Sequence, residues 1–391
     1  MSKQKNTGTV DFNKAKHRAQ TKKILRKLRI PIAVIAVINV FCIVLAAVGE
    51  TRRSNFMDSF RAIPATIGDS HGYPYNEDEL SLSKVTLVGD KPLIVSESGV
   101  KVLSQEGDEL YDLHLEWGDT KAITNNGRAL IFSNTSGKSY LISRTKTLAQ
   151  FSEEGLLVTG FVANNGSVAA CTTTDTKQSV VRVYNPRQKL VFQLNCDRDY
   201  VSSLSLSKSG KTLLMSAVNE KNAELYSTVS LYKTSKTEPK FETVIEGTTI
   251  LKVTYASSNK FVAIGDNKTV VLNSKGEILN EINYADDALY AVDSDSDGNT
   301  MLCYKEFGGS KIKVVTFPSS GKKTNEFELD YAPASIDFRD RHIAAAIDNT
   351  VTVYSLSGGK RETYECNTNV STVLIASAGI YTLETGSVCK Y

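Results

Sequence analysis

The chain has 391 residues and a net charge of +3, and 41% of its residues are hydrophobic and 23% charged. These values are typical of globular proteins and exclude a wholly disordered chain. Residues 1–29 carry ten Lys or Arg and one Asp, so residues 50–391 carry a net charge of −6. A mildly acidic domain of that size is a poor electrostatic partner for nucleic acid, which we exclude as its ligand.

The segment after the basic tail is apolar. Residues 30–48 contain no charged side chain, and at ~1.5 Å per residue in a helix they match the ~30 Å hydrocarbon core of a bilayer. The larger basic excess stays on the cytoplasmic side of a membrane. We therefore expect a single-pass cell-membrane protein with a cytoplasmic tail over 1–29, a transmembrane helix over 30–48 and an extracytoplasmic remainder.

Three alternatives apply to this region. The apolar run could be a signal peptide cleaved near Leu45–Gly49, or a buried core helix. The basic tail is expected to contact anionic lipid headgroups, and the alternative is that it docks a cytoplasmic protein. Residues 49–81 are expected to be a juxtamembrane linker.

Residues 82–391 contain a degenerate repeat of short strands and turns. An apolar strand end, a small polar turn and a strongly apolar strand recur, as in Ile123-TNNG-RALIF, Val162-ANNG-SVAAC and Leu206-SKSG-KTLLM. The Asn, Asp and Gly residues favour tight hairpin turns. A second, more alternating pair of strands follows each copy, which gives four strands per unit. Units begin near Ser83, Asp119, Leu157, Val201, Ile250, Leu289, Ala334 and Ser371.

Four strands in a repeat of about 40 residues indicate an all-β fold, a β-propeller. The eighth unit has room for about three strands, and ring closure then requires a strand from elsewhere. We expect eight blades, with the missing strand donated from within 49–81. Seven blades are the alternative, and a non-closed β-solenoid or paired sandwiches are the other architectures considered.

The layout resembles an uncharacterised family of Gram-positive bacterial single-span membrane proteins with a propeller-like domain of unknown function. The most family-like element precedes the first blade and contains Gly72-Tyr73-Pro74. The blades are WD40-like or quinoprotein-like in layout, but they lack the Trp-Asp ending of WD40 repeats, since Gly118 follows the only tryptophan, Trp117. The resemblance implies a fold and a membrane location and no activity.

Asp293, Asp295 and Asp297 begin like a calcium-binding loop, because alternating carboxylates before a glycine can converge on one hard cation. The bidentate Glu expected at the twelfth position is replaced by Tyr304. The segment also aligns with the polar hairpin turns of the other blades. We therefore expect a hairpin turn here, with calcium as the alternative and no other cofactor.

Two acidic connections between blades are the candidate ligand-facing loops. They contain Asp197 and Asp199, and Asp286 and Asp287. Their charge predicts a basic or cationic ligand. Cysteine is scarce for a disulfide scaffold, and we expect Cys171 and Cys303 to be buried thiols; Cys366 and Cys389 are the candidate pair.

No assembled catalytic motif is found in the sequence, so we expect a non-enzymatic binding or scaffolding module at the cell envelope. Its partner would be an envelope protein or a glycan. The alternatives are a ligand sensor that signals through the helix and a propeller enzyme of the quinoprotein type, which would need aromatic and metal-coordinating side chains around the channel.

Overall fold

The computed structural model describes residues 50–62, 72–76, 84–221, 224–284, 288–294, 298–306, 309, 311–317 and 325–391. The chain divides into two compact units, Met1–Arg53 and Ser54–Tyr391, and the second contains all of the described strands. The expected membrane span, residues 30–48, lies outside the described residues. Within the described part, no helix combines the length and the apolar character needed to cross a membrane.

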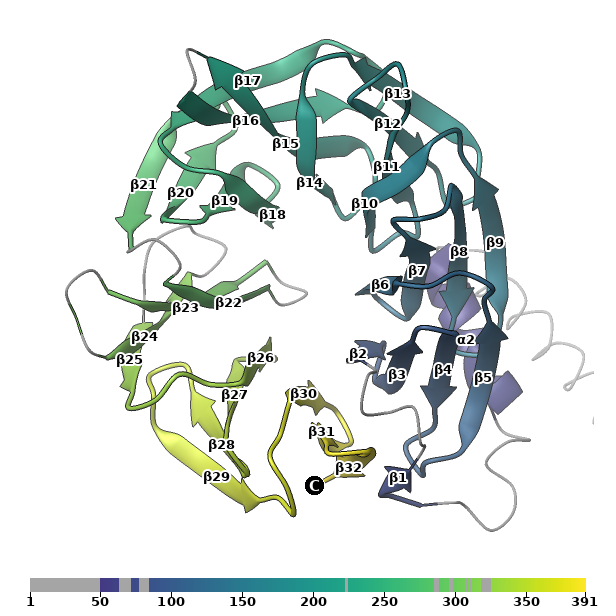
Figure 1. The fold of residues 1–391 in the computed structure, drawn as a ribbon, viewed down its shortest axis with the longest axis vertical. Coiled ribbons are helices and arrows are strands. Elements are labelled where there is room, and N and C mark those ends of the chain that lie inside the picture. The colour runs from purple at the N-terminus through teal and green to yellow at the C-terminus, as the bar shows by residue number, and fades with distance from the viewer. Residues whose placement is uncertain are drawn as a thin grey trace, which may run out of the picture. The chain divides into compact units, whose positions relative to one another are not determined.

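Residues 75–391 form a β-propeller of eight four-stranded antiparallel sheets (Figure 1). Strands within a blade are called A to D from the inside of the ring outward. Blades 1 to 4 are β2 (Lys84–Val88), β3 (Lys91–Ser96), β4 (Gly99–Leu103), β5 (Glu109–His114); β6 (Thr120–Asn125), β7 (Arg128–Ser133), β8 (Lys138–Ser143), β9 (Thr147–Ser152); β10 (Leu156–Val162), β11 (Val168–Thr173), β12 (Ser179–Tyr184), β13 (Leu190–Cys196); and β14 (Tyr200–Leu206), β15 (Thr212–Lys221), β16 (Glu224–Lys233), β17 (Pro239–Glu246).

The remaining blades continue in chain order until the last strand. Blades 5 to 8 are β18 (Ile250–Ser257), β19 (Lys260–Gly265), β20 (Lys268–Asn273), β21 (Ile278–Asn283); β22 (Leu289–Ser294), β23 (Thr300–Lys305), β24 (Ile312–Phe317), β25 (Asn325–Leu329); β26 (Ser335–Arg339), β27 (His342–Ile347), β28 (Thr350–Ser355), β29 (Lys360–Glu365); and β30 (Thr372–Ala376), β31 (Gly379–Glu384), β32 (Ser387–Lys390), β1 (Tyr75–Asn76). The eight-bladed prediction is confirmed, and all eight predicted unit starts lie within one residue of the start of an observed A strand.

Ring closure uses a strand from the beginning of the folded unit, as predicted. β1 pairs antiparallel with β32, with Tyr75 opposite Val388 and Asn76 opposite Ser387. The preceding residues also join blade 1, because Gly72 N donates to Glu106 O (3.0 Å) and the Tyr73 hydroxyl donates to Ser104 O (2.8 Å). The last blade is thereby completed and its open edge is paired.

The core consists of eight apolar clusters, one at each interface between neighbouring blades. The B strands explain this arrangement, because both of their faces are buried. In β7, Ala129 and Ile131 pack toward blade 1, whereas Leu130 and Phe132 pack toward blade 3. Successive side chains of a strand point to opposite faces. Burying both faces therefore requires an uninterrupted apolar run in each B strand.

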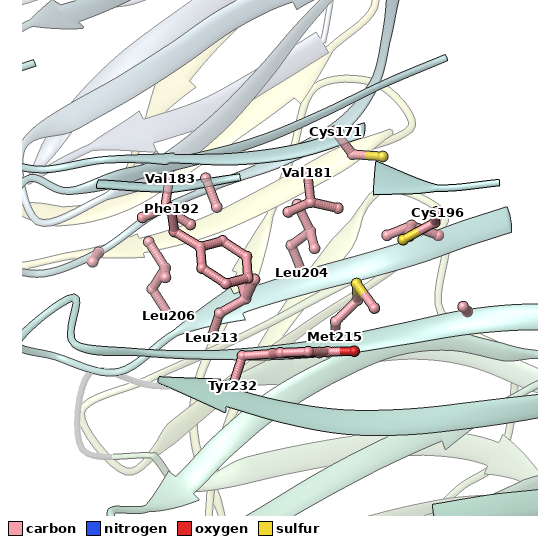
Figure 2. Close-up of a cluster of buried hydrophobic side chains, with 14 residues drawn as sticks. Cys171, Val181, Val183, Phe192, Cys196, Leu204, Leu206, Leu213, Met215 and Tyr232 are labelled. Carbon is pink, nitrogen blue, oxygen red and sulfur yellow. The ribbon is translucent and has the colours of Figure 1, made fainter. Parts of the chain in front are cut away.

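The cluster between blades 3 and 4 shows how the interface is filled (Figure 2). Phe192 from β13 and Tyr232 from β16 lie with ring centroids 5.9 Å apart. Cys171 and Cys196 belong to the same cluster as buried free thiols. Cys303 occupies the position of Cys171 on the equivalent strand β23, and it is also buried and free, as predicted.

Helix α2 (Glu50–Ala62) lies in the stretch that was expected to be a linker. Its residues from Ser54 onward belong to the propeller unit. Asn55 Nδ2 donates to Asn126 O (3.0 Å), and Arg144 donates to Asn55 O (2.5 Å). The Thr145 hydroxyl donates to the buried Asp58 carboxylate (2.7 Å). The helix is therefore attached to the turns of blade 2 by polar contacts.

Candidate binding face

The connections of the blades divide between two faces of the propeller. The AB face consists of the A-to-B and C-to-D connections. The DA face consists of the B-to-C and blade-to-blade connections. The described part of the DA face comprises residues 97–98, 115–119, 134–137, 153–155, 174–178, 197–199, 247–249, 266–267, 284, 288, 306, 309, 311, 330–334, 348–349, 366–371 and 385–386.

The DA face is acidic. Its described connections contain twelve acidic residues and three basic ones. The acids are Glu97, Glu116, Asp119, Glu153, Glu154, Asp175, Asp197, Asp199, Asp266, Glu306, Asp330 and Asp348, and the bases are Lys177, Arg198 and Lys311. Most of these acidic side chains are exposed. The face therefore carries a negative potential that a cationic partner would match.

The A strands of four consecutive blades share a bulge close to the DA face. The register with the B strand shifts by one residue at Val158 in β10, Ser202 in β14, Leu251 in β18 and Tyr290 in β22. The A strands of the other four blades pair without a shift. A bulge inserts one unpaired residue and redirects its side chain. The bulges thus mark one half of the ring, blades 3 to 6.

Three of the four bulged residues are exposed apolar side chains: Val158 is 42% exposed, Leu251 53% and Tyr290 43%. The fourth, Ser202, donates a hydrogen bond to Ile250 O (2.7 Å) in the next blade. A strands line the inside of the ring (Figure 1). The bulges therefore place exposed apolar side chains on the innermost strands, close to the DA face.

Neighbouring exposed apolar residues extend this surface. Leu156 and Tyr200 begin the A strands of blades 3 and 4, and Tyr331 lies in the connection between blades 6 and 7. Together with Val158, Leu251 and Tyr290 they form what we call the apolar arc. An exposed apolar group of this kind within a polar surround is typical of an interaction site.

One of the two predicted ligand-facing loops, residues 197–199, is described and belongs to the DA face. Asp197 is exposed and forms an ion pair with Lys177 (2.9 Å). Burial and the nearby Glu242 raise the pKa of Asp199. Asp286 and Asp287 lie outside the described residues, so only the first loop is placed, between Cys196 and Tyr200 at the edge of the apolar arc.

The first residue of the predicted calcium loop, Asp293, lies at the opposite end of an A strand. Asp293 is on β22, before the A-to-B connection, and Asp295 and Asp297 are outside the described residues. Asp293 Oδ1 accepts a hydrogen bond from Ser294 N (2.7 Å), and Asp293 Oδ2 accepts one from Phe338 N (3.0 Å). Among the described residues, no group of three His, Cys, Asp or Glu side chains is placed to hold a metal.

A second carboxylate, Asp337 on β26, continues this pattern into the next blade. Its Oδ2 accepts from Ile375 N (2.7 Å). Ser203 accepts from Val253 N in the same way, and Ser335 accepts from Val373 N (3.1 Å each). The inner edge of an A strand would otherwise leave its N–H groups unpaired. These polar side chains are therefore acceptors that join adjacent blades.

Asp337 and Asp293 also influence each other. Burial, reinforced by the negative charge of Asp293, raises the pKa of Asp337 well above the usual range of a carboxyl group. Two carboxylates in one site cannot both be ionised at low cost, so one of them keeps its proton. The hydrogen bonds to Phe338 and Ile375 assign this pair a role in joining blades 6, 7 and 8.

The chain matches known proteins at two levels. The sequence profile of a family of unknown function, DUF5711, matches residues 73–387, which extends from the ring-closing segment into β32. No curated protein matches the chain. The structure of BamB from Moraxella catarrhalis is similar with a TM-score of 0.51 and 13% identity, over 81% of this chain and 98% of that one.

Two other solved structures have lower similarity. A eukaryotic initiation factor matches with a TM-score of 0.47 and 12% identity, over 78% of this chain and 90% of that one. The C-terminal WD40 domain of Sif2 matches with a TM-score of 0.42 and 12% identity, over 70% and 98%. At 13% identity, the similarity to BamB shows a shared propeller fold.

Proposed function

The chain belongs to the DUF5711 family, and we propose that it is a membrane-anchored, extracytoplasmic propeller that acts as a non-enzymatic binding or scaffolding module of the cell envelope. The apolar run over 30–48, flanked by a basic tail, supports the anchor and its orientation. The resemblance to single-span membrane proteins of Gram-positive bacteria supports the same location.

The apolar arc is the observation that carries the binding role. Bulges at equivalent positions in blades 3, 5 and 6 expose Val158, Leu251 and Tyr290 on the innermost strands. The exposed half of each side chain gains no burial in the isolated domain, and covering it with a partner would contribute about 1 kcal/mol. Bulges next to functional sites commonly redirect side chains in this way.

The surrounding charge defines the partner. The apolar arc belongs to the acidic DA face, whose described connections contain twelve acids and three bases. A matching protein surface would have apolar side chains at its centre and Lys or Arg around them. We therefore propose an envelope protein with a basic, amphipathic segment as the partner, rather than a glycan.

Site-specific photo-cross-linking in intact cells tests this proposal. A photo-reactive phenylalanine analogue replaces Leu251 or Tyr290 in a tagged full-length chain, and the cross-linked products are identified from the membrane fraction. Ile278 and Leu279 on β21 serve as matched controls, because they are equally exposed apolar residues on an outer D strand.

The proposal predicts that both test positions capture the same protein and that the control positions do not. Capture from all four positions alike, or from the controls alone, would contradict the assignment of the DA face. Capture of no protein at Leu251 and Tyr290 would contradict a protein partner, and a glycan would then be the ligand to examine.

A further inference from the structure

We propose that the AB face lies against the anionic headgroups of the membrane that anchors the chain, so that the acidic DA face points away from it. This inference rests on the membrane anchor of the proposed function. It adds a lipid-contacting surface and fixes which face of the propeller remains available to a partner.

Helix α2 provides the first argument. It begins at Glu50, two residues after the apolar run ends at Val48, and a helix of 13 residues is about 20 Å long. Its contacts are with Asn126 in the A-to-B turn and with Arg144 and Thr145 in the C-to-D turn of blade 2. Both turns belong to the AB face, so the helix that follows the apolar run in the sequence contacts that face.

The glycine beside this helix shows how closely the helix and the turn approach. A Cβ at Gly127, where φ is +76°, would lie 2.8 Å from Asn55 Oδ1. Asp58 is buried against the same blade. The same helix exposes Phe56 and Met57. Exposed apolar side chains next to a membrane span are suited to the interfacial region of the bilayer.

Charge provides the second argument. The described AB-face connections contain nine basic and six acidic residues, whereas the DA face has three and twelve. Eight of the nine basic side chains are exposed and form no ion pair with a described residue; they are Lys146, Arg187, Lys189, Lys208, Lys211, Lys236, Lys275 and Arg341.

Three of the six acids on the described AB face are held by Arg339 or Ser104, whereas Glu106, Glu238 and Glu277 are exposed. Asp90 and Asp340 are both paired with Arg339, and Asp108 accepts from Ser104. The cations are distributed over blades 2, 3, 4, 5 and 7, so they form a broad surface rather than a pocket. Lys and Arg near an anionic bilayer contribute about 1 kcal/mol each. An anionic bilayer surface would therefore attract the basic AB face. The same surface would repel the acidic DA face, which would point away from the membrane.

Energy transfer in reconstituted membranes tests the orientation. The full-length chain is placed in vesicles that contain phosphatidylglycerol and a headgroup-labelled acceptor lipid. A donor dye is attached to Cys in Ser274→Cys, on the AB face, or in Thr176→Cys, on the DA face. The five cysteines of the described part are buried, which favours selective labelling, and the unsubstituted chain sets the background.

The inference predicts at least twofold more efficient transfer from position 274 than from position 176, because strands of about six residues separate the faces by roughly 20 Å. Changing Lys146, Lys189, Lys236 and Lys275 to Gln should reduce that ratio, as should vesicles of phosphatidylcholine alone. Equal or reversed transfer from membrane-inserted protein would overturn the inference and leave the anchor intact. Release of the chain by alkaline carbonate would instead overturn the anchor.

Discussion

Tyr75 on β1 lies opposite Val388 on β32, and this pair joins two residues that are 313 positions apart in the sequence. The short strand β1 contributes only two residues to the ladder. The side chains before it supply further contacts, because Tyr73 packs against the buried Tyr381 with ring centroids 5.5 Å apart. Ring closure thus depends on a few residues at the start of the folded unit.

Tyr73→Ala should lower the free energy of unfolding by about 2 kcal/mol or more, because it removes the ring contact and the hydrogen bond to Ser104. Tyr73→Phe keeps the ring and should cost only about 1 kcal/mol. Chemical denaturation of both variants measures the difference. Equal stability of the two variants would show that the aromatic packing does not contribute to closure.

Glu153 should be far more important to stability than Asp197, although both form an ion pair with blade 3. Glu153 and Arg182 are largely buried and 3.0 Å apart, and Tyr184 also donates to Glu153. Glu153→Ala leaves a buried charge and should cost about 3 kcal/mol. Asp197→Ala breaks an exposed pair and should cost less than about 1 kcal/mol. Similar losses in urea denaturation would refute the distinction.

Gly358 should tolerate alanine much less well than Gly386. Both glycines have a positive φ, +81° and +75°, which costs any other residue about 1–2 kcal/mol. A Cβ at Gly358 would also lie 2.4 Å from Phe327 Cβ, whereas the space around Gly386 is open. We expect Gly358→Ala to lower the unfolding temperature more than Gly386→Ala does. The reverse order would contradict the packing of this turn against blade 6.

The raised pKa of Asp337 predicts that the stability of the protein depends on pH. This pKa is raised to about 8 in the folded protein, from 3.8. The folded state therefore binds more protons than the unfolded state between about pH 4 and pH 8, and the unfolding free energy falls as pH rises through that window. Asp337→Asn retains an acceptor for Ile375 N. The unfolding free energy of this variant should fall by about 1 kcal/mol less, or by still less, between pH 5 and pH 8 than that of the unsubstituted chain. An unchanged pH slope would exclude Asp337 as its source.

The eight blades could be predicted from the sequence because each B strand is apolar on both faces and most A-to-B turns contain Asn, Asp or Gly. The missing fourth strand of the last unit then required a donor before Ser81, and β1 fulfils that requirement. These features are local and repeat eight times, so even a degenerate copy can be recognised.

Helix α2, the bulges and the division of charge between the two faces were not predicted. The helix attaches through Asn55 and Asp58 to turns that are distant in sequence, and polar contacts of this kind have no periodicity. A bulge adds one residue to a strand, as at Tyr290, which a variable repeat conceals. The charge division becomes visible only when every connection is assigned to a face.

The most direct test of the proposed binding face is the affinity of the cross-linked partner for two matched double variants of the full-length chain. Leu251→Ser with Tyr290→Ser removes two bulged residues of the apolar arc, and Ile278→Ser with Leu279→Ser removes two equally exposed residues of an outer strand. We predict a loss of affinity of at least tenfold for the first variant and less than twofold for the second. Equal affinities of both variants and the unsubstituted chain would contradict binding at the DA face.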